Sequence, residues 1–352
     1  MRFLAPAVLL GVLMAPAAAA ARTPEPLVDL PPQTTRFADR VIEGGGAPPR
    51  ARAAAAARPY ATPDGTSVSV EFSPSYPENP EVAQTYVNFL GSLPHGTELA
   101  RLKLMLAPPD EVRSTCGGVE GVLACYDGRT HTMVVPGEQI ESESGVTTSY
   151  VVAHEYGHHV AAYRSNPPFT AMDWGPKFWS SYTKVCDKVL AGRLVPGAEG
   201  RFYTANPGES WAEVYARLKY PDEPWRFTRL LKPDAAALGV AQRDVLQPWT
   251  TPRRKTFTGT FGGRGTTDVH RFAFPLTLDG GLRVTLHGPS RAKYDIGVSS
   301  LGQTRGKTRG NAARDKLSWR AACRQRRSEQ VTVTVSRRQG SGKFSVDVTY
   351  AG

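Results

Sequence analysis

The pentapeptide at residues 154–158, H-E-Y-G-H, constrains the fold more than any other stretch of the chain. Apolar residues flank it on both sides, namely Val151, Val152, Ala153, Val160, Ala161 and Ala162. A segment that is apolar on most sides predicts a buried helix, which we expect to begin at a capping Thr147 or Thr148. Because residues four apart share one face of a helix, His154 and His158 can both direct a ring nitrogen at one metal ion.

Glu155 lies beside that face, where its carboxylate can take a proton from a water in the open position of the metal. Two histidines four residues apart, the first followed directly by a glutamate, form the H-E-x-x-H pattern of zinc-dependent hydrolases. Gly157 puts no side chain between the two histidines. The alternative is a buried helix whose histidines only hydrogen-bond within a core. A third metal ligand elsewhere in the chain would decide between the two interpretations.

A second motif at residues 206–216 supplies a candidate for that ligand. Asn206 suits the N-cap of a helix and Pro207 its first position. Glu209 and Glu213 then share one face, where two carboxylates repel unless a cation or N–H groups lie between them. A zinc site supplies both, with Glu209 as ligand and Glu213 accepting from the other ring nitrogen of a ligand histidine. The alternative for Glu209 is a capping-box role, accepting from the amide of Asn206.

Together, H-E-Y-G-H and N-P-G-E-S-W-A-E resemble the zinc peptidases of the glutamate-zincin class. The second motif is similar to the E-x-x-A-E helix of the anthrax lethal factor catalytic domain. The resemblance implies that His154, His158 and Glu209 bind zinc and that Glu155 is the general base. It also implies a tyrosine upstream of the ligand glutamate that stabilises the oxyanion, for which Tyr203 is the nearest match. The alternative for this tyrosine is ordinary packing of its ring.

The N-terminus has the composition of a secretory signal peptide. Arg2 precedes an apolar run from Leu4 to Met14 and small residues from Ala17 to Ala21, so we expect residues 1–21 to be removed and the protein to be secreted. The alternative is an uncleaved anchor. No other stretch approaches eighteen apolar residues, so we expect no transmembrane segment in the mature protein. Residues 22–58, rich in Pro, Ala, Gly and Arg, are expected to form a disordered leader or a short propeptide.

Residues 59–250 are expected to form an α+β catalytic domain of zincin type, with a mixed sheet and active-site helices. Strand patterns occur at Thr66–Phe72, Leu102–Leu106, Val122–Cys125 and Thr132–Val135, and helical patterns at Glu81–Leu93 and Lys177–Leu194. Thr132–Val135 is the last strand before the histidine helix. It is placed either to bind an extended peptide along its edge or simply to cover the core.

Four cysteines in an exported chain predict disulfide bonds. We expect Cys116 to pair with Cys125, because the glycines between them can form a tight hairpin. Whether Cys186 and Cys323 pair with each other stays open. The absence of C-x-x-C spacing argues against a cysteine zinc site.

Residues 251–352 are expected to form an all-β sandwich. Seven short runs alternate apolar and polar residues, at Phe257–Phe261, Val269–Leu276, Leu282–Leu286, Tyr294–Val298, Leu317–Ala321, Val331–Val335 and Phe344–Val348. In this pattern and in the segments A-K-Y-D-I and G-S-G-K-F-S-V, the region resembles the bacterial pre-peptidase C-terminal domains that follow secreted peptidases.

Basic residues concentrate in this region. From Arg253 to Gly352 there are 20 Lys and Arg against 6 Asp and Glu, whereas the rest of the chain has 23 against 26. Such a domain suits an anionic cell wall or polysaccharide, or an acidic protein. The alternative for the clusters Arg324–Arg327 and Arg337–Arg338 is that they are solvated faces without a partner. Nucleic acid is not expected as a partner, because the chain is exported and shows no ladder of aromatic residues for stacking bases.

The sequence therefore predicts a secreted zinc metallopeptidase with one catalytic zinc ion and a protein or peptide substrate. Glu155 would take the proton of a metal-activated water and pass it to the leaving amine, and Tyr203 would steady the oxyanion. Two alternatives remain. One is a non-catalytic wall-binding or adhesion protein with a structural zinc site, and the other is metal-dependent hydrolysis of a non-peptide amide.

Overall fold

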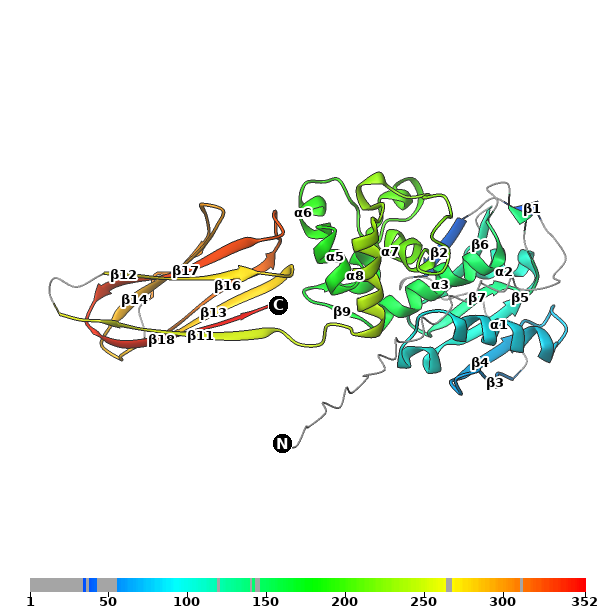
Figure 1. The fold of residues 1–352 in the computed structure, drawn as a ribbon, viewed down its shortest axis with the longest axis horizontal. Coiled ribbons are helices and arrows are strands. Elements are labelled where there is room, and N and C mark those ends of the chain that lie inside the picture. Colours follow the sequence, from blue (N-terminus) through cyan, green and yellow to red (C-terminus); the bar gives the residue numbers. More distant parts are fainter. Residues whose placement is uncertain are drawn as a thin grey trace, which may run out of the picture.

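The computed structural model describes residues 34–35, 38–42, 56–118, 121–139, 141–142, 146–263, 268–310 and 313–352. The predicted signal peptide and most of the predicted leader lie outside these residues. The described residues form a mixed part with helices and a sheet, followed by an elongated all-β part (Figure 1). The chain is thus α+β with several sheets. None of its described helices is both long and apolar enough to cross a membrane.

A six-stranded mixed sheet underlies the first part. Its order is β2-β6-β7-β5-β4-β3. The strands are β2 Ala38–Ile42, β3 Arg58–Ala61, β4 Ser67–Phe72, β5 Lys103–Ala107, β6 Val122–Asp127 and β7 Thr132–Pro136. β4, β5 and β7 run parallel to one another, while β3 and β6 run antiparallel to their neighbours β4 and β7. Each of the four strand segments predicted for this part corresponds to one strand of the sheet.

Two expectations about this sheet need correction. β7 is hydrogen-bonded on both sides, to β5 and to β6, so it has no free edge for an extended peptide. β2 lies within residues 22–58, where we expected no regular structure, yet it pairs in parallel with β6. The short β1 Thr34–Thr35 likewise pairs with β8 Glu141–Ser142. Strands of two to five residues are too short to show a period in composition, but a neighbouring strand edge can still order them.

Helices cover this sheet and extend away from it. They are α1 Pro80–Ser92, α2 Pro109–Thr115, α3 Thr148–Ala162, α4 Ala171–Trp174, α5 Lys177–Tyr182, α6 Val185–Leu190, α7 Pro207–Ala216 and α8 Ala235–Leu246. Shorter 3₁₀ turns lie at Thr97–Arg101, Gly200–Ala205 and Arg229–Leu231, and β9 Ser165–Asn166 pairs with β10 Phe169–Thr170. The single helix expected over Lys177–Leu194 is wrong, because Lys184 has a left-handed backbone conformation (φ 56°) that an α-helix does not contain.

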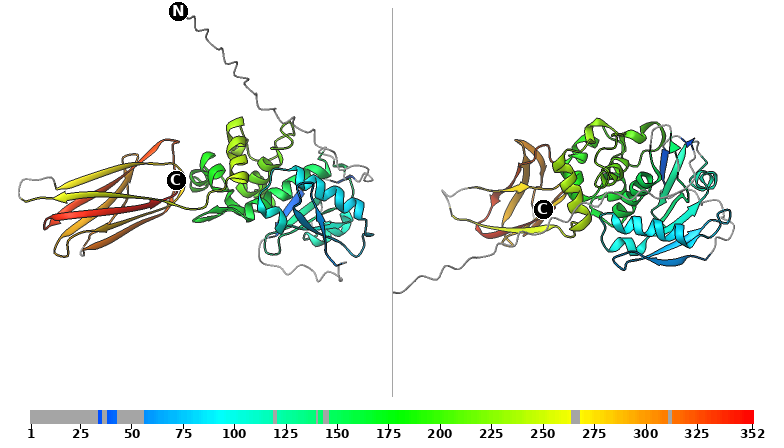
Figure 2. Two further views of the ribbon diagram at one scale, coloured as in Figure 1. Left: turned by 60° about the horizontal axis from the view of Figure 1, so that its bottom comes forward. Right: turned by 45° about the vertical axis from the view of Figure 1, so that its right-hand side comes forward.

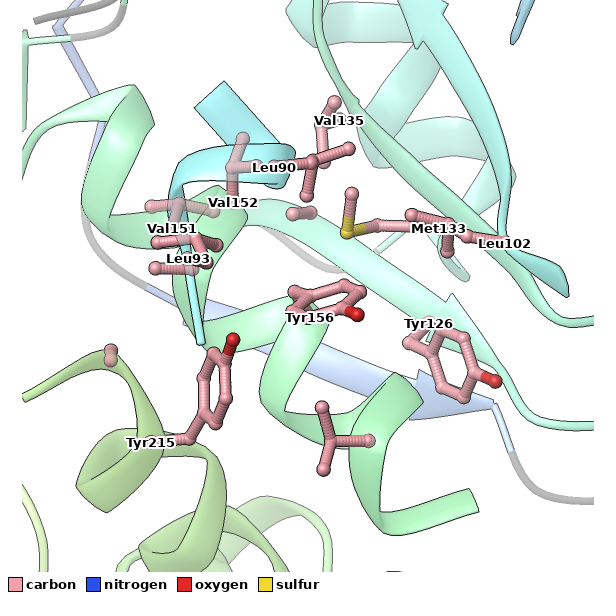
Figure 3. Close-up of a cluster of buried hydrophobic side chains, with 14 of the residues drawn as sticks. Leu90, Leu93, Leu102, Tyr126, Met133, Val135, Val151, Val152, Tyr156 and Tyr215 are labelled. Carbon is pink, nitrogen blue, oxygen red and sulfur yellow. The ribbon is translucent and has the colours of Figure 1, made fainter. Parts of the chain in front are cut away.

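The largest apolar core lies where α3 meets the sheet on one side and α7 on the other. Figure 3 shows Tyr156 of α3 among Met133 of β7, Tyr126 of β6 and Tyr215 of α7, all fully buried or nearly so. The rings of Tyr156 and Tyr215 are 5.6 Å apart, centroid to centroid. α3 is therefore held between two layers and has little freedom to shift along its length.

The all-β part consists of two four-stranded sheets packed face to face. Their orders are β11-β18-β13-β16 and β12-β17-β14-β15. The strands are β11 Arg253–Phe261, β12 Val269–Leu276, β13 Gly280–His287, β14 Lys293–Ser300, β15 Gln303–Lys307, β16 Arg314–Ala322, β17 Glu329–Gln339 and β18 Gly342–Tyr350. Each of the seven predicted strands is present. β15 was missed because its sequence, Q-T-R-G-K, has no apolar alternation and forms an edge.

Both disulfides are formed. Cys116 pairs with Cys125 as predicted, and Cys186 of α6 pairs with Cys323 just after β16, so the second bond joins the two parts of the chain. Figures 1 and 2 show the all-β part extending from the side that carries α5 and α6, with the C-terminus back at this junction. The pairing of Cys186 and Cys323, which the sequence left open, is thus a link between the two parts.

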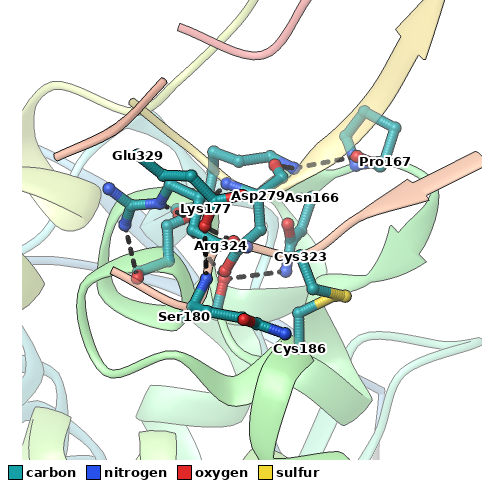
Figure 4. The surroundings of a disulfide bond; sticks show 11 residues. Asn166, Pro167, Lys177, Ser180, Cys186, Asp279, Cys323, Arg324 and Glu329 are labelled. Atoms are coloured by element: carbon teal, nitrogen blue, oxygen red, sulfur yellow. Dashed lines mark hydrogen bonds and ion pairs between the residues drawn. A yellow bond between two sulfur atoms is a disulfide. The ribbon is translucent and has the colours of Figure 1, made fainter. Parts of the chain in front are cut away.

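Buried charges accompany this link (Figure 4). The ammonium of Lys177 donates to the carbonyls of Pro167 and Asp279 at 2.8 and 3.0 Å. Arg324 donates through its guanidinium to the carbonyl of Ser181, and through its backbone amide to the carboxylate of Asp279, each at 2.6 Å. Because these groups are almost entirely shielded from water, breaking the contacts would leave charges buried without partners.

Candidate metal centre

Helix α3 carries the H-E-Y-G-H motif through the middle of the first part. The Thr147 hydroxyl accepts from the amide of Tyr150, which caps the helix at the position predicted from the sequence. His154, Glu155 and His158 have no exposed surface. The predicted buried helix is confirmed, and its two histidines lie one turn apart with ring centroids separated by 5.1 Å.

Helix α7 brings the second motif against α3. The side chain of Asn206 accepts from the amide of Gly208 at 2.9 Å, and Pro207 is the first helical residue, as predicted. The amide of Asn206 donates to the carbonyl of Tyr203 at 3.0 Å. Glu209 therefore does not act as a capping-box residue, because the donor that it would satisfy already has a partner. Its fully buried side chain points instead to the histidines of α3.

Gly157 allows this close approach of the two helices. A Cβ at Gly157 would lie 2.8 Å from the Cα of Ala212 in α7, a distance that real Cβ atoms essentially never show. The indole nitrogen of Trp211 donates to the carbonyl of Gly157 at 2.9 Å, which ties the helices together at the same point. The sequence interpretation assigned this glycine to the gap between the ligands, whereas its main structural role is the contact with α7.

The ligand atoms of His154, His158 and Glu209 converge. Glu209 Oε2 lies 3.4 Å from His154 Nε2 and 3.3 Å from His158 Nε2, and all three ligand atoms lie within 4.8 Å of one another. These separations exceed the usual length of about 2.7–3.2 Å for a N–H···O hydrogen bond. Ligands of a tetrahedral zinc ion at about 2.0–2.1 Å stand about 3.3 Å apart. The three residues thus fit a zinc ion on donor chemistry and on spacing.

Glu213 lies on the far side of the His154 ring. Its Oε2 is 3.4 Å from His154 Nδ1, and its Oε1 is 3.5 Å from the guanidinium of Arg226. Arg226 also pairs with Glu223 at 3.0 Å and lies over the ring of Tyr150. Burial raises the pKa of Tyr150, and the charge of Glu213 raises it further, so this phenol stays neutral. Glu213 thus lies beside His154, as predicted, whereas the sequence did not indicate Arg226.

Arg226 gave no signal in the sequence. It lies after α7 in a segment without regular periodicity, and only the folded chain brings it to Glu213. Glu155 also lies on α3 and is fully buried, but it does not belong to the three-residue cluster of ligand atoms.

Tyr203 is separated from His154 by one aromatic ring. The ring of Phe227 stacks on His154 with centroids 5.9 Å apart and planes at 19°, and the ring of Tyr203 lies 5.3 Å from that of Phe227. The Tyr203 hydroxyl is buried and has no hydrogen-bond partner among the described residues. Phe227, which the sequence interpretation did not single out, covers the side of His154 toward Tyr203.

His159, directly after the second predicted ligand, has a structural role. Its Nε2 donates to the carbonyl of Glu98 at 2.8 Å, and its Nδ1 lies 3.0 Å from the hydroxyl of Tyr126. Burial lowers the pKa of His159 to about 4, which keeps the ring neutral. The helix thus directs His158 toward Glu209 and His159 toward the sheet.

No established protein family and no curated protein matches this chain. Among solved structures, the C-terminal β fold is weakly matched by the pre-peptidase C-terminal domain of a collagenase from Bacillus anthracis, with 10% identity and a TM-score of 0.23, covering 27% of this chain and 88% of that chain. The CBM36-1 domain of a multidomain xylanase from the hindgut metagenome of Trinervitermes trinervoides gives 13% identity and a TM-score of 0.21, covering 28% of this chain and 99% of that chain. Likenesses at this level establish neither family nor function.

Proposed function

We propose that this protein is a secreted zinc-dependent endopeptidase of the glutamate-zincin class, with a zincin-like catalytic part and a C-terminal part that resembles pre-peptidase C-terminal domains. The proposal rests on one observation. The ligand atoms of His154 and His158 lie 3.4 and 3.3 Å from the same oxygen of Glu209, in surroundings closed to water. Two imidazoles and a carboxylate are the ligand set of one large group of catalytic zinc sites.

Each residue of the site has a distinct part in the proposed reaction. Zinc bound there would act as a Lewis acid on the scissile carbonyl and would make water reactive near neutral pH. Glu155 accepts the proton of the attacking water and delivers it to the leaving amine. Glu213 fixes the orientation of the His154 ring. The hydroxyl of Tyr203 donates a hydrogen bond to the oxyanion once the substrate has entered.

Entry of a substrate requires movement of the aromatic cover. Phe227 is only 6% exposed and stacks on His154, and Tyr203 packs against it. We propose that these two rings turn away when a peptide binds. The Tyr203 hydroxyl, which has no partner among the described residues, would then gain one in the complex.

The complete burial of the three ligands also favours a second candidate function. Structural zinc sites are closed and four-coordinate, whereas catalytic sites keep an open position. A wall-binding or adhesion protein with a structural zinc site would therefore show the same burial. Hydrolysis of a non-peptide amide at the same centre is a variant of the first proposal.

One experiment separates these candidates. The purified protein is expected to contain about one zinc per chain, and Glu209→Ala is expected to remove it. Glu155→Gln should keep the zinc but lower hydrolysis of a peptide library by about 10²–10⁴-fold. Unchanged hydrolysis in Glu155→Gln would overturn the assignment of the base. Zinc without any chelator-sensitive cleavage would favour the structural site, and protein without zinc would overturn both.

A further inference from the structure

The outer face of the sheet β11-β18-β13-β16 gathers basic side chains from strands that are remote in sequence. Strand register places Arg283 of β13 across from Ser318 of β16, and His287 of β13 across from Arg314 of β16. Lys316 of β16 lies between them, across from Thr285. On the far side of β18, Arg254 of β11 completes the group. These basic residues line a pocket of about 290 Å³ on this face.

The charge of this pocket is nearly all positive. Asp347 is the one carboxylate among its lining residues. It pairs with Arg254 at 2.6 Å, accepts from the Thr256 hydroxyl at 2.6 Å and lies 3.5 Å from His287. Asp347 thus holds Arg254 in place and offsets a single charge.

Arg283, Arg314 and Lys316 make no ion pair within the described part of the chain, and all three are exposed. Three exposed positive charges on one face, without a carboxylate partner among the described residues, suit a negative partner outside the chain.

Three arginines of the basic clusters that are visible in the sequence make contacts with other residues of the chain. Arg324 contacts Asp279 and Ser181 at the junction, Arg337 pairs with Asp268, and Arg338 pairs with Asp295. The interpretation of these clusters as solvated faces is wrong for the buried Arg324, whereas Arg326, Arg327 and Arg338 are exposed. The basic residues that line the pocket lie on the sheet face, where strand register brings β11, β13 and β16 together.

The basic pocket continues into a second pocket of about 460 Å³ at the junction of the two parts. Arg283 and Thr349 line both pockets. The second pocket adds Arg320 and the rings of Trp249 and Trp319. Strands in a sheet are spaced by about 4.8 Å, so a path from β11 across to β16 and on to the junction is longer than a single small anion. Its length and repeated charges suit a polymer.

We propose that this groove, defined by Arg254, Arg283, Arg314 and Lys316, binds an acidic polysaccharide. The carboxylate, sulfate or phosphate groups of the polymer would pair with these basic residues. Hydroxyls on the same face, including that of Thr285, suit the many hydroxyls of a sugar. None of the residues lining the first pocket is Phe, Tyr or Trp, which disfavours stacked bases of a nucleic acid.

The test compares two variants of the full chain that remove the same charge. Arg283→Gln/Lys316→Gln changes the basic face, and Arg271→Gln/Lys307→Gln changes the outer face of the other sheet, where Arg271 lies across from Thr334 and Lys307 across from Gly297. Binding to polygalacturonate, dextran sulfate and a phosphate-bearing wall polymer is measured at several salt concentrations, with neutral dextran, polyglutamate and single-stranded DNA as competitors.

We expect at least one acidic polysaccharide to bind, with a loss of about tenfold or more in Arg283→Gln/Lys316→Gln and a change of less than about twofold in the matched control. The three polymers distinguish carboxylate, sulfate and phosphate as the recognised group. Equal losses in both variants would overturn the proposal, because binding would then follow net charge alone. Equal or tighter binding of polyglutamate or DNA would also overturn it. Neither result depends on whether the metal centre hydrolyses peptides.

Discussion

His154 is held between two carboxylates of α7: Glu209 lies 3.4 Å from its Nε2 and Glu213 lies 3.4 Å from its Nδ1. The two glutamates are one helical turn apart, so a single helix faces both nitrogens of the ring. Arg226, 3.5 Å from Glu213, provides the second of these carboxylates with a counter-charge inside the fold. The orientation of the proposed ligand thus depends on residues that would not touch the metal.

Glu213→Gln is expected to weaken zinc binding by about 10–100-fold while leaving the fold intact, since the amide no longer accepts from His154 as a carboxylate does. Competition with a zinc chelator measures the affinity. Glu223→Gln is the matched control, because Glu223 also pairs with Arg226 and has no described contact with His154. Similar losses in both variants would show that Arg226, and not Glu213, carries the effect.

Gly157→Ala is expected to destabilise the protein by about 1–3 kcal/mol and to weaken zinc binding, because the added Cβ would push α7 away from α3. Gly239→Ala in α8 is the control, since its Cβ would meet nothing within 4 Å. That substitution should stabilise the protein by about 0.5–1 kcal/mol through helix propensity. Urea unfolding gives both values, and an unchanged Gly157→Ala would contradict the close contact of the helices.

Tyr203→Phe is expected to lower peptide hydrolysis by about 10²-fold with zinc content unchanged, because the oxyanion loses a hydrogen-bond donor. Tyr182→Phe, at the junction beside Arg327, is the control and should keep full activity. The effect should fall on kcat more than on KM. If Tyr203→Phe keeps full activity, the phenol only packs against Phe227.

The contribution of Asp244 to the stability of the protein is expected to fall as the pH rises from about 4 to 7. The carboxylate of Asp244 accepts from the amides of Phe178 and Trp179 at the start of α5, and burial raises its pKa from 3.8 to about 7 despite those bonds. A carboxyl with a raised pKa in the folded state stabilises it below the unfolded pKa and loses that contribution as pH rises through the folded pKa. Burial raises the pKa of Asp279 to about 6, which adds a change of the same sign.

Asp244→Asn should remove this contribution, since an amide does not ionise, so the stability of the variant should fall less, or rise more, over this pH range than that of the wild type. Urea unfolding between pH 4.5 and 8 measures it. Asp234→Asn, which changes the exposed carboxylate that caps α8, serves as the control and should keep the wild-type slope. Identical slopes in wild type and Asp244→Asn would refute the assignment to Asp244.

The residues of the candidate metal centre that could be predicted from the sequence are those whose relative positions follow from their spacing along a helix. His154 and His158 lie one turn apart on α3, and the Asn206 cap starts α7 so that Glu209 and Glu213 share a face. Phe227 lies in a segment that shows neither helical nor strand periodicity. It reaches His154 only through tertiary packing, so its position could not be predicted from the sequence.

The same distinction applies to the rest of the fold. Alternation predicted the strands of the sandwich but not β15, whose residues bury little. It also could not show that β7 has a neighbour on each side, because sheet order depends on chain segments far away. The helix break at Lys184 lies within an apolar pattern that continues across it, and the basic face around Arg283 arises only from register.

The two parts of the chain cannot move independently of each other. They are joined by the disulfide between Cys186 and Cys323 and by the buried contacts of Lys177 and Arg324. A polymer held on the basic face would therefore sit at one set separation and angle from the proposed zinc centre. A catalytic domain on a flexible linker can occupy many positions around its binding domain. In this molecule the zinc centre would instead stay at a fixed distance from the bound polymer. The site of attachment would therefore determine which peptide bonds the zinc centre can reach.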